Sequence, residues 1–334
     1  MDSRFIYLFL KSLVKFHYFS QSALSFVASL IQNKLITPVE IRNFENIYIG
    51  GKVFSNYSIK PGKKIAFIDI STLQNYRYDN SLIILNNNDF CDKSCYSTVL
   101  KIKKNSLNLQ IIIWDFDNHH LLATSLRLMF LSNIYFGAHQ HNFEFLRRTS
   151  FKYFGFLSAC VVQWPREFLT FHIQNMLFTS RSNELFGPHV HYPAFTRRNN
   201  IIKSVSTNFP KVFFSNFSYH NRSLEDRFSE WCNFKIHFIA PVDHDLPIRL
   251  FDALVTGGIP LVPIKLKNLL HALSLDSFVV FYNECNLEFL HLKVDEAIIK
   301  FDEEGPEGML TRINFVLANH HIDSRINFLI NFSE

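Results

Sequence analysis

The segment PIRLFDALVTGGIPLVP, residues 247–263, constrains the fold more than any other part of the chain. Apolar side chains recur at helical spacing over residues 250–254, which predicts a short helix after the proline. Gly257 and Gly258 predict the end of this helix, because glycine adopts left-handed backbone angles without a steric cost. The apolar run 259–262 then predicts a buried strand of a parallel sheet. This segment therefore indicates an α/β fold.

Strand and helix patterns alternate along most of the chain, which is typical of parallel sheets joined by crossover helices. The predicted strands lie near residues 47–49, 65–70, 82–85, 111–114, 134–136, 159–162, 211–214, 235–240, 259–262 and 278–282. The predicted helices lie near residues 119–131, 142–148, 166–177, 199–207, 223–231, 248–256, 287–301 and 308–320.

A polar stretch at residues 179–187 interrupts this alternation and predicts a domain boundary. We expect an N-terminal α/β domain over residues 1–178 and a C-terminal α/β domain with terminal helices over residues 179–334. The predicted fold class is α/β, with two Rossmann-like parallel-sheet domains that face a cleft.

The amino-acid composition limits the class of ligand or surface that the protein is expected to bind. The 334 residues carry a formal net charge of +5, and the cations are scattered rather than gathered in a long basic tract. This pattern favours anionic small molecules or a membrane surface over nucleic acid. Five cysteines at irregular spacing do not form a disulfide framework, so we expect free thiols and a cytoplasmic protein.

The first 31 residues are apolar, but Lys11 and Lys15 interrupt the run, and the run at residues 22–31 is too short to span a bilayer. We expect a pair of amphipathic helices that pack on the first domain. Peripheral contact with the inner membrane surface, with the two lysines near lipid phosphates, is the alternative.

Ligands of open α/β sheets bind beyond the carboxyl ends of the strands. In the second domain this rule selects the loop that contains His244 and the helix that begins after Pro247. The free N–H groups of a helix N-terminus suit a diphosphate, and Arg249 adds a charge-assisted contact. Arg249 and Asp252 could instead be a solvated pair on the helix surface.

The same residues resemble a sequence pattern of the GT-B glycosyltransferases. The nucleotide-sugar-binding domain of that family has a pattern close to (S/P)-x-R-x-(F/L)-E-A-x-x-x-G-x-(I/V)-P-(V/I), and residues 247–260 match its first fourteen positions with Asp252 in place of Glu. Outside this motif the resemblance is one of layout, over about residues 180–325.

The resemblance implies a donor site formed by His244, Arg249, Asp252, Gly257 and Gly258. In the family, the acid at the Asp252 position accepts hydrogen bonds from the ribose, and the two glycines would let the backbone approach the nucleotide. Retaining members often have an acid eight residues before this position, where the chain has His244. The sequence therefore assigns neither a retaining nor an inverting reaction.

The first domain is expected to supply the acceptor side and the catalytic base. Asp115 and His119 follow the strand at 111–114, and His139 follows the next strand. Histidine, or a preorganised carboxylate, suits the general base that activates a sugar hydroxyl. These three residues are our catalytic candidates, although helix capping by Asp115 and surface histidines would give the same pattern.

Three alternatives use the same residues. Asp115-Phe116-Asp117 matches the D-x-D pattern with which GT-A glycosyltransferases hold a divalent cation, and His119, His139 and His141 could form a transition-metal site. The chain could also be a degenerate GT-B-like module that binds a nucleotide or glycan without turnover. A nucleophile elbow, a Walker loop and a G-x-G-x-x-G motif are absent from the sequence, which argues against typical hydrolases, P-loop NTPases and dinucleotide enzymes.

The sequence as a whole predicts a metal-independent glycosyltransferase of glycan biosynthesis that needs no cofactor. Its expected partners are a nucleotide-sugar donor and a glycan or lipid-linked acceptor, and no nucleic acid. The identities of the sugar, the base and the acceptor do not follow from these residues.

Overall fold

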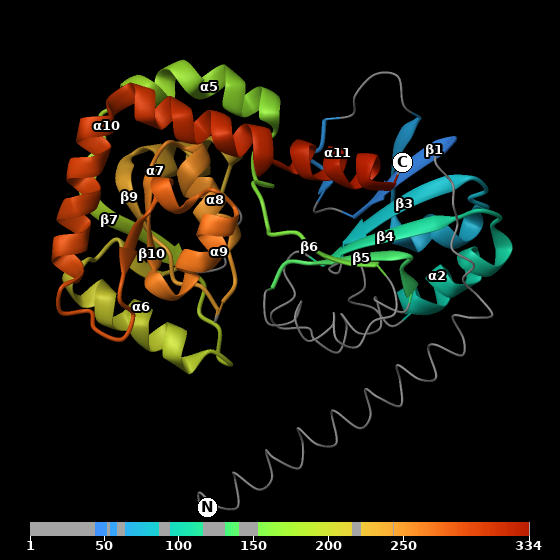
Figure 1. Cartoon of the computed structure of the whole chain (residues 1–334), viewed down its shortest axis with the longest axis horizontal. Helices are drawn as coiled ribbons and strands as arrows, with labels where there is room; N and C mark the ends of the chain where they lie inside the picture. Colours follow the sequence, from blue (N-terminus) through green and yellow to red (C-terminus); the bar gives the residue numbers. More distant parts are fainter. Residues whose placement is uncertain are drawn as a thin grey trace, which may run out of the picture. The chain divides into compact units, whose positions relative to one another are not determined.

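The computed structural model describes residues 44–51, 54–58, 64–86, 94–115, 131–139, 153–215, 222–242 and 244–333. The chain forms two compact units (Figure 1). The first unit contains residues 61–157 together with the chain up to Lys52, and the second contains residues 158–332 together with the short segment Val53–Lys60. The predicted N-terminal helices lie outside the described residues. No helix in the described ranges is both long enough and apolar enough to cross a membrane.

The first unit is built on a six-stranded parallel sheet with the strand order β2-β1-β3-β4-β5-β6. Its strands are β1 (Asn46–Gly50), β2 (Ile65–Ile68), β3 (Ser81–Asn86), β4 (Gln110–Asp115), β5 (Ile134–Gly137) and β6 (Tyr153–Phe156). Strands β3 and β4 are buried along their whole length, as their unbroken apolar runs predict for the centre of a parallel sheet.

Helix α2 (Ser94–Asn105) and the 3-10 helix η2 (Ile70–Asn75) pack against each other beside this sheet. Val99 and Ile102 of α2 share a buried apolar cluster with Ile83 of β3 and Ile113 of β4. This cluster forms the core on one face of the first sheet.

The second unit is built on a five-stranded parallel sheet with the strand order β11-β10-β9-β7-β8. Its strands are β7 (Ser182–His189), β8 (Val212–Phe214), β9 (Phe234–Phe238), β10 (Ile259–Pro263) and β11 (Val280–Tyr282). The two parallel-sheet α/β domains predicted from the sequence are therefore confirmed.

Helices cover both faces of the second sheet (Figure 1). The helices that contact its strands are α6 (Thr196–Asn208), α7 (Leu224–Cys232), α8 (Ile248–Val255) and α10 (Leu290–Asn319). The second unit also contains α5 (Arg166–Phe178), α9 (Lys267–Ala272) and most of α11 (Ile322–Ser333), with the 3-10 helices η5 (Ile264–Leu266) and η6 (Asp276–Phe278). Apolar side chains of α6 and α10 share one core cluster with alternate residues of β7, β9, β10 and β11. Helices α7 and α8 contact β9 and β10 respectively.

Most of the elements predicted for the described residues are present, and the clearest difference is at β7. The helices predicted at 119–131 and 142–148 lie outside the described residues, except for residue 131. Residues 179–187 are predicted to be a polar boundary, whereas Ser182–His189 is a central strand of the second sheet. Its first half is polar and partly exposed, which hides the strand pattern, and only its last five residues are fully buried. The predicted strand at 159–162 is wrong, since only Val161 makes an isolated bridge there, to His321, and the preceding strand is β6.

The division of the chain also differs in position from the expected domain boundary at residue 179. The two compact units separate at Leu157, before α5. Helix α5 packs against α10 and therefore belongs with the second sheet (Figure 1). A helix pattern alone does not reveal which sheet the helix covers.

The long helix α10 is two helices in its backbone geometry, as the sequence predicts. Gly305 has φ 53° and ψ −154° inside it, and Pro306 follows. This glycine adopts a left-handed backbone angle at no steric cost, and proline suits the first turn of the second segment.

Two buried arginines hold the carboxyl end of α8. Arg181 donates to the carbonyl of Thr256 at 2.7 Å, and Arg312 donates from Nη2 to the carbonyl of Gly257 at 2.9 Å. Arg312 also pairs with Glu304. The last carbonyls of a helix have no partner within the helix, so these guanidinium groups satisfy groups that would otherwise be buried without a hydrogen bond.

Arg312→Met should lower the free energy of unfolding by about 2 kcal/mol, because it leaves the buried Gly257 carbonyl without its donor. The measurement is urea unfolding followed by circular dichroism. Lys293→Met is the control on the same helix, since Lys293 forms an exposed ion pair with Glu296 and its loss should cost less than about 0.5 kcal/mol. Equal stability losses in the two variants would contradict this role of Arg312.

Candidate functional site

The strand order of the second unit identifies where a ligand should bind. The chain passes from β7 to β8 on one side of the sheet and then to β9 on the other side, so β7 and β9 flank the point where the strand order reverses. Open α/β sheets bind ligands beyond the carboxyl ends of the strands at this point. A ligand site is therefore expected at the ends of β7 and β9.

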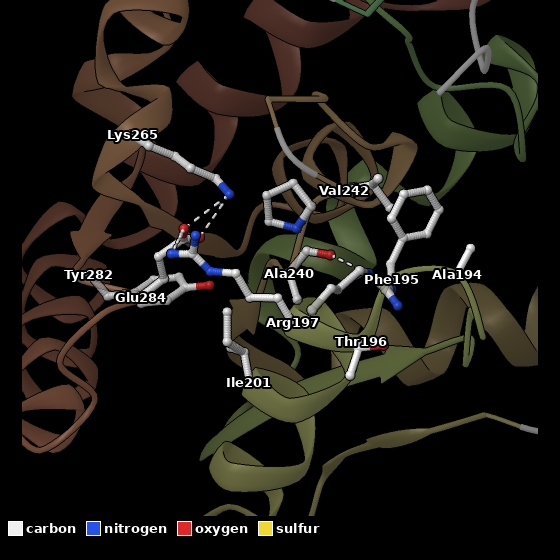
Figure 2. Close-up of a pocket in the computed structure, with 12 residues that line it drawn as sticks. Ala194, Phe195, Thr196, Arg197, Ile201, Ala240, Val242, Lys265, Tyr282 and Glu284 are labelled. Carbon is white, nitrogen blue, oxygen red and sulfur yellow. Dashed lines mark hydrogen bonds and ion pairs between the residues drawn. The ribbon is translucent and has the colours of Figure 1, made fainter. Parts of the chain in front are cut away.

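A cavity of about 210 Å³ lies at this edge of the second sheet (Figure 2). Its lining comes from the first turns of α6, the loop after β9, the residue Lys265 after β10, and the end of β11. The lining residues are Ala194, Phe195, Thr196, Arg197, Arg198, Ile201, Ala240, Pro241, Val242, Lys265, Tyr282 and Glu284. The cavity thus coincides with the position that the sheet topology selects.

Three cations and one anion line this cavity. Arg197 Nη2 lies 2.9 Å from Glu284 Oε1, and Lys265 Nζ lies 2.9 Å from Glu284 Oε2 (Figure 2). The third cation, Arg198, is buried. The N-terminus of α6 also faces the cavity, and it carries no side-chain cap. Cations and uncapped helix N–H groups together suit a phosphate or diphosphate ligand.

Arg198 joins the loop after β7 to the end of β9. Its Nε donates to the carbonyl of Ala240 at 2.9 Å and its Nη1 donates to the carbonyl of Val190 at 2.7 Å. Its Nη2 lies 3.3 Å from Nδ1 of His189, whose Nε2 lies 3.0 Å from the carbonyl of Phe238. The carbonyl can only accept, so His189 is protonated on Nε2 and accepts on Nδ1.

Burial and the two neighbouring arginines hold the pKa of His189 well below its usual value, which keeps this ring neutral. Burial, followed by the proximity of Arg249, lowers the pKa of Arg198 to about 10, so its guanidinium remains charged at neutral pH. The network therefore places a fixed positive charge beside the cavity.

Arg249, a predicted donor-binding residue, lies in the first turn of α8 and is half-buried. Its Nε donates to the carbonyl of Pro188 in β7 at 3.0 Å. Its terminal nitrogens form no hydrogen bond with any residue in the described ranges. Arg249 therefore lies beside the switch point of the sheet, although it does not line the cavity.

His244, the second predicted donor-binding residue, lies in the turn before α8 and is half-buried. It is absent from the lining of the cavity described above. Its donor-binding role remains a prediction.

Asp252, the predicted ribose acceptor, is completely buried. Gln163 Nε2 donates to Asp252 Oδ2, and Arg227 donates to Gln163 Oε1 at 2.9 Å. Asp252 Oδ1 has no hydrogen-bond partner among the described residues. Burial raises the pKa of this carboxyl to about 7, although the hydrogen bond from Gln163 and the nearby arginines act in the opposite direction.

This environment differs from the solvated helix-surface pair that was the alternative for Arg249 and Asp252. Asp252 is also absent from the lining of the cavity. In the present arrangement it connects α8, α7 and the segment before α5 through Gln163.

Gly257 and Gly258, also predicted to contact the donor, lie at the other edge of the sheet, where α8 ends and β10 begins. Gly257 has φ +81°, and a Cβ at Gly258 would lie 2.4 Å from the ring of His237. That ring stacks on Trp231 with their centroids 4.8 Å apart. Backbone geometry and tight packing account for both glycines, so we do not include them in the proposed site.

The first unit brings together two of the three predicted catalytic residues at one sheet edge. Asp115 is the last residue of β4 and aligns with Gly137 of β5, two residues before His139. Both side chains are buried, and Tyr135 donates a hydrogen bond to Asp115. His119 lies outside the described residues.

The metal-site alternatives depend mainly on residues that the structure does not describe. In the described ranges, no group of three or more His, Cys, Asp or Glu side chains is placed to hold a metal ion. Asp117 of the D-x-D pattern, and His119 and His141 of the proposed histidine site, lie outside those ranges.

Sequence reasoning missed the residues that line the cavity, namely Arg197, Arg198, Lys265 and Glu284. The signal was present, because Arg197 and Arg198 open the helix after β7, and Lys265 and Glu284 each follow a strand. The polar first half of β7 predicts a boundary segment rather than a strand, so the sequence shows no strand end before the two arginines.

The comparisons with known proteins complete this description. No protein-family model matches the sequence, and no curated protein matches it. Among solved structures, the chain is similar to alpha,alpha-trehalose 6-phosphate synthase from Burkholderia multivorans, with 9% sequence identity and a TM-score of 0.49. The similarity covers 77% of this chain and 71% of that chain.

The raised pKa of Asp252 predicts a pH dependence of stability. The unfolded chain releases this proton near pH 4, whereas the folded chain holds it until about pH 7. Stability from this group should therefore be present at low pH and fall as the pH rises from about 4 to about 7. Asp252→Asn keeps an oxygen for Gln163 and removes the ionisation, so its advantage over the wild type should grow by about 1 kcal/mol per pH unit.

Urea unfolding of both proteins at pH 5, 6, 7 and 8 measures this difference. Buried neutral histidines such as His189 change stability in the opposite sense, but they are common to both proteins and cancel in the comparison. Parallel stability curves for the wild type and Asp252→Asn would show that Asp252 has an ordinary pKa.

Proposed function

We propose that the protein is a glycosyltransferase that uses a nucleotide-activated sugar, and that its second unit binds this donor. The observation that carries the proposal is the cationic cavity at the switch point of the second sheet. Its volume of about 210 Å³ is below the range of about 300–1,000 Å³ typical of whole-ligand pockets. A diphosphate with part of the attached groups fits this volume better than a complete nucleotide sugar does.

In this proposal, Arg197, Lys265 and the N-terminus of α6 hold the diphosphate. Arg249 and the N-terminus of α8 contribute a second set of donors at the same sheet edge. When the bond from the sugar to the diphosphate breaks, negative charge grows on the leaving phosphate oxygen. Fixed cations and helix N–H groups stabilise that charge, so the reaction that we propose is independent of a metal ion.

Asp252 has a different role in this proposal from the one that the resemblance implies. Through Gln163 it anchors α8 to α7 and to the segment before α5, and it thereby positions the first turn of α8. Direct contact with a ribose would require this completely buried carboxylate to become accessible to the ligand. We therefore propose Asp252 as a positioning residue of the donor site.

For the acceptor side of the reaction we propose the first unit. Asp115 and His139 follow neighbouring strands at the ligand edge of its sheet, where a general base for a sugar hydroxyl would be placed. A glycan or a lipid-linked sugar is the acceptor class that this proposal names.

A nucleotide-binding module without turnover is the second candidate. The complete burial of Asp252 and the presence of His244 where retaining enzymes have an acid favour it. Release of nucleoside diphosphate during incubation with donor and a panel of glycan acceptors separates the two functions. Binding without release or transfer would support the module.

The donor site is tested by thermal unfolding in the presence of UDP, GDP, CMP and ADP sugars, with and without EDTA. We expect at least one of these ligands to raise the Tm and EDTA to leave the shift unchanged. Arg249→Met should weaken binding of that ligand by about tenfold or more, because it removes a charge-assisted contact worth about 1.5–3 kcal/mol.

Lys293→Met is the control, since it removes one positive charge from an exposed pair on α10. It should leave the affinity within about twofold of the wild type, because Lys293 does not line the cavity and its charge is exposed and paired with Glu296. A lack of any nucleotide-induced shift in the wild type would refute the proposed function. A shift that EDTA abolishes would instead favour the D-x-D alternative.

A further inference from the structure

Glu284 occupies an unusual position in the candidate site. It follows β11, its side chain is only 9% exposed, and its two carboxylate oxygens contact Arg197 and Lys265 (Figure 2). These are two of the three cations that line the cavity, and the third, Arg198, is engaged with backbone carbonyls. The carboxylate of Glu284 thus already contacts the two cations that the phosphate oxygens of a ligand would contact.

This carboxylate sets the charge of the cavity. With three cations and one anion the lining has a formal net charge of +2. A diphosphate esterified at both ends carries two negative charges, which match this value. A terminal phosphate group adds nearly one further negative charge at neutral pH, because its second ionisation has a pKa of about 6.

We propose that Glu284 is a specificity-determining residue that favours a nucleoside diphosphate sugar over a free nucleoside diphosphate, an inference that rests on the proposed function. The carboxylate accepts hydrogen bonds from sugar hydroxyls, which are donors. It repels a terminal phosphate placed at the same point, since like charges in contact are costly across an interface.

This discrimination has a consequence for turnover. Transfer of the sugar breaks the bond between the anomeric carbon and the terminal phosphate oxygen, and the leaving nucleoside diphosphate keeps the electron pair. The acceptor hydroxyl forms the new bond and loses its proton to the general base. The product therefore exposes a terminal phosphate to Glu284, which favours its release from the site.

Glu284→Gln tests the inference by removing the charge while keeping the shape of the side chain. Isothermal titration calorimetry measures the affinities of the nucleotide sugar that gives the largest thermal shift, of its matching nucleoside diphosphate, and of inorganic pyrophosphate. In Glu284→Gln, the nucleoside diphosphate and pyrophosphate should bind about tenfold more tightly than in the wild type, because a like charge has been removed. The affinity for the nucleotide sugar should change by less than about threefold, because its diphosphate carries no terminal ionisation.

Two further variants separate charge from structure. Glu284→Asp keeps the negative charge and should retain the wild-type preference for the nucleotide sugar. Glu307→Gln makes the same change of net charge at an exposed position on α10 and should leave all three affinities unchanged. The Tm of each variant establishes that it is folded at the temperature of the titration.

The failures of the two proposals are distinguishable. If the wild type binds nucleotides but Glu284→Gln leaves the preference unchanged, the role of Glu284 is refuted and the donor site stands. The same conclusion follows if Glu284→Gln changes the affinities for all three ligands equally. If the wild type binds no nucleotide and no nucleotide sugar, the proposed function fails and the inference about Glu284 fails with it.

Discussion

The candidate site depends on one buried guanidinium group. Arg198 is 6% exposed and joins the loop after β7, the end of β9 and the neutral ring of His189. Strands β7 and β9 flank the reversal of strand order, so this network determines how their ends are spaced. An arginine with three different acceptors holds that spacing, and a lysine with one compact charge would not reproduce its planar geometry.

The two edges of the second sheet use cations in opposite ways. At the amino edge, Arg181 and Arg312 donate hydrogen bonds to the carbonyls of Thr256 and Gly257 at the end of α8. Arg312 also pairs with Glu304. At the carboxyl edge, the terminal nitrogens of Arg249 are without a partner in the described ranges. The hydrogen bonds at the amino edge therefore hold the end of α8, and Arg249 lies in the first turn of the same helix at the carboxyl edge. The division matches the rule that α/β folds place their ligands at the carboxyl ends of the strands.

The motif that dominates the sequence also spans both edges, and this explains why only part of it belongs to the site. A helix of eight residues is about 12 Å long, so Arg249 in its first turn and Gly257 beyond its end lie at opposite ends of the helix. Gly257 allows the positive φ of the turn, and Gly258 leaves room for the ring of His237. Arg249 contacts β7. Asp252, in the middle, is buried against Gln163 and connects neighbouring elements.

The sequence alone determined the α/β class, most strands and helices, and the break in α10, because apolar periodicity and glycine or proline positions are local properties. It also indicated Arg249, since that residue follows a recognisable strand and opens a helix. Tertiary structure decided the rest. Strand β7 is recognised only from its pairing with β9 and β8, because its polar first half hides the apolar pattern of a buried strand. The cluster of Arg197, Arg198, Lys265 and Glu284 draws its members from three separate strand ends, and only the pairing of the strands brings those ends together.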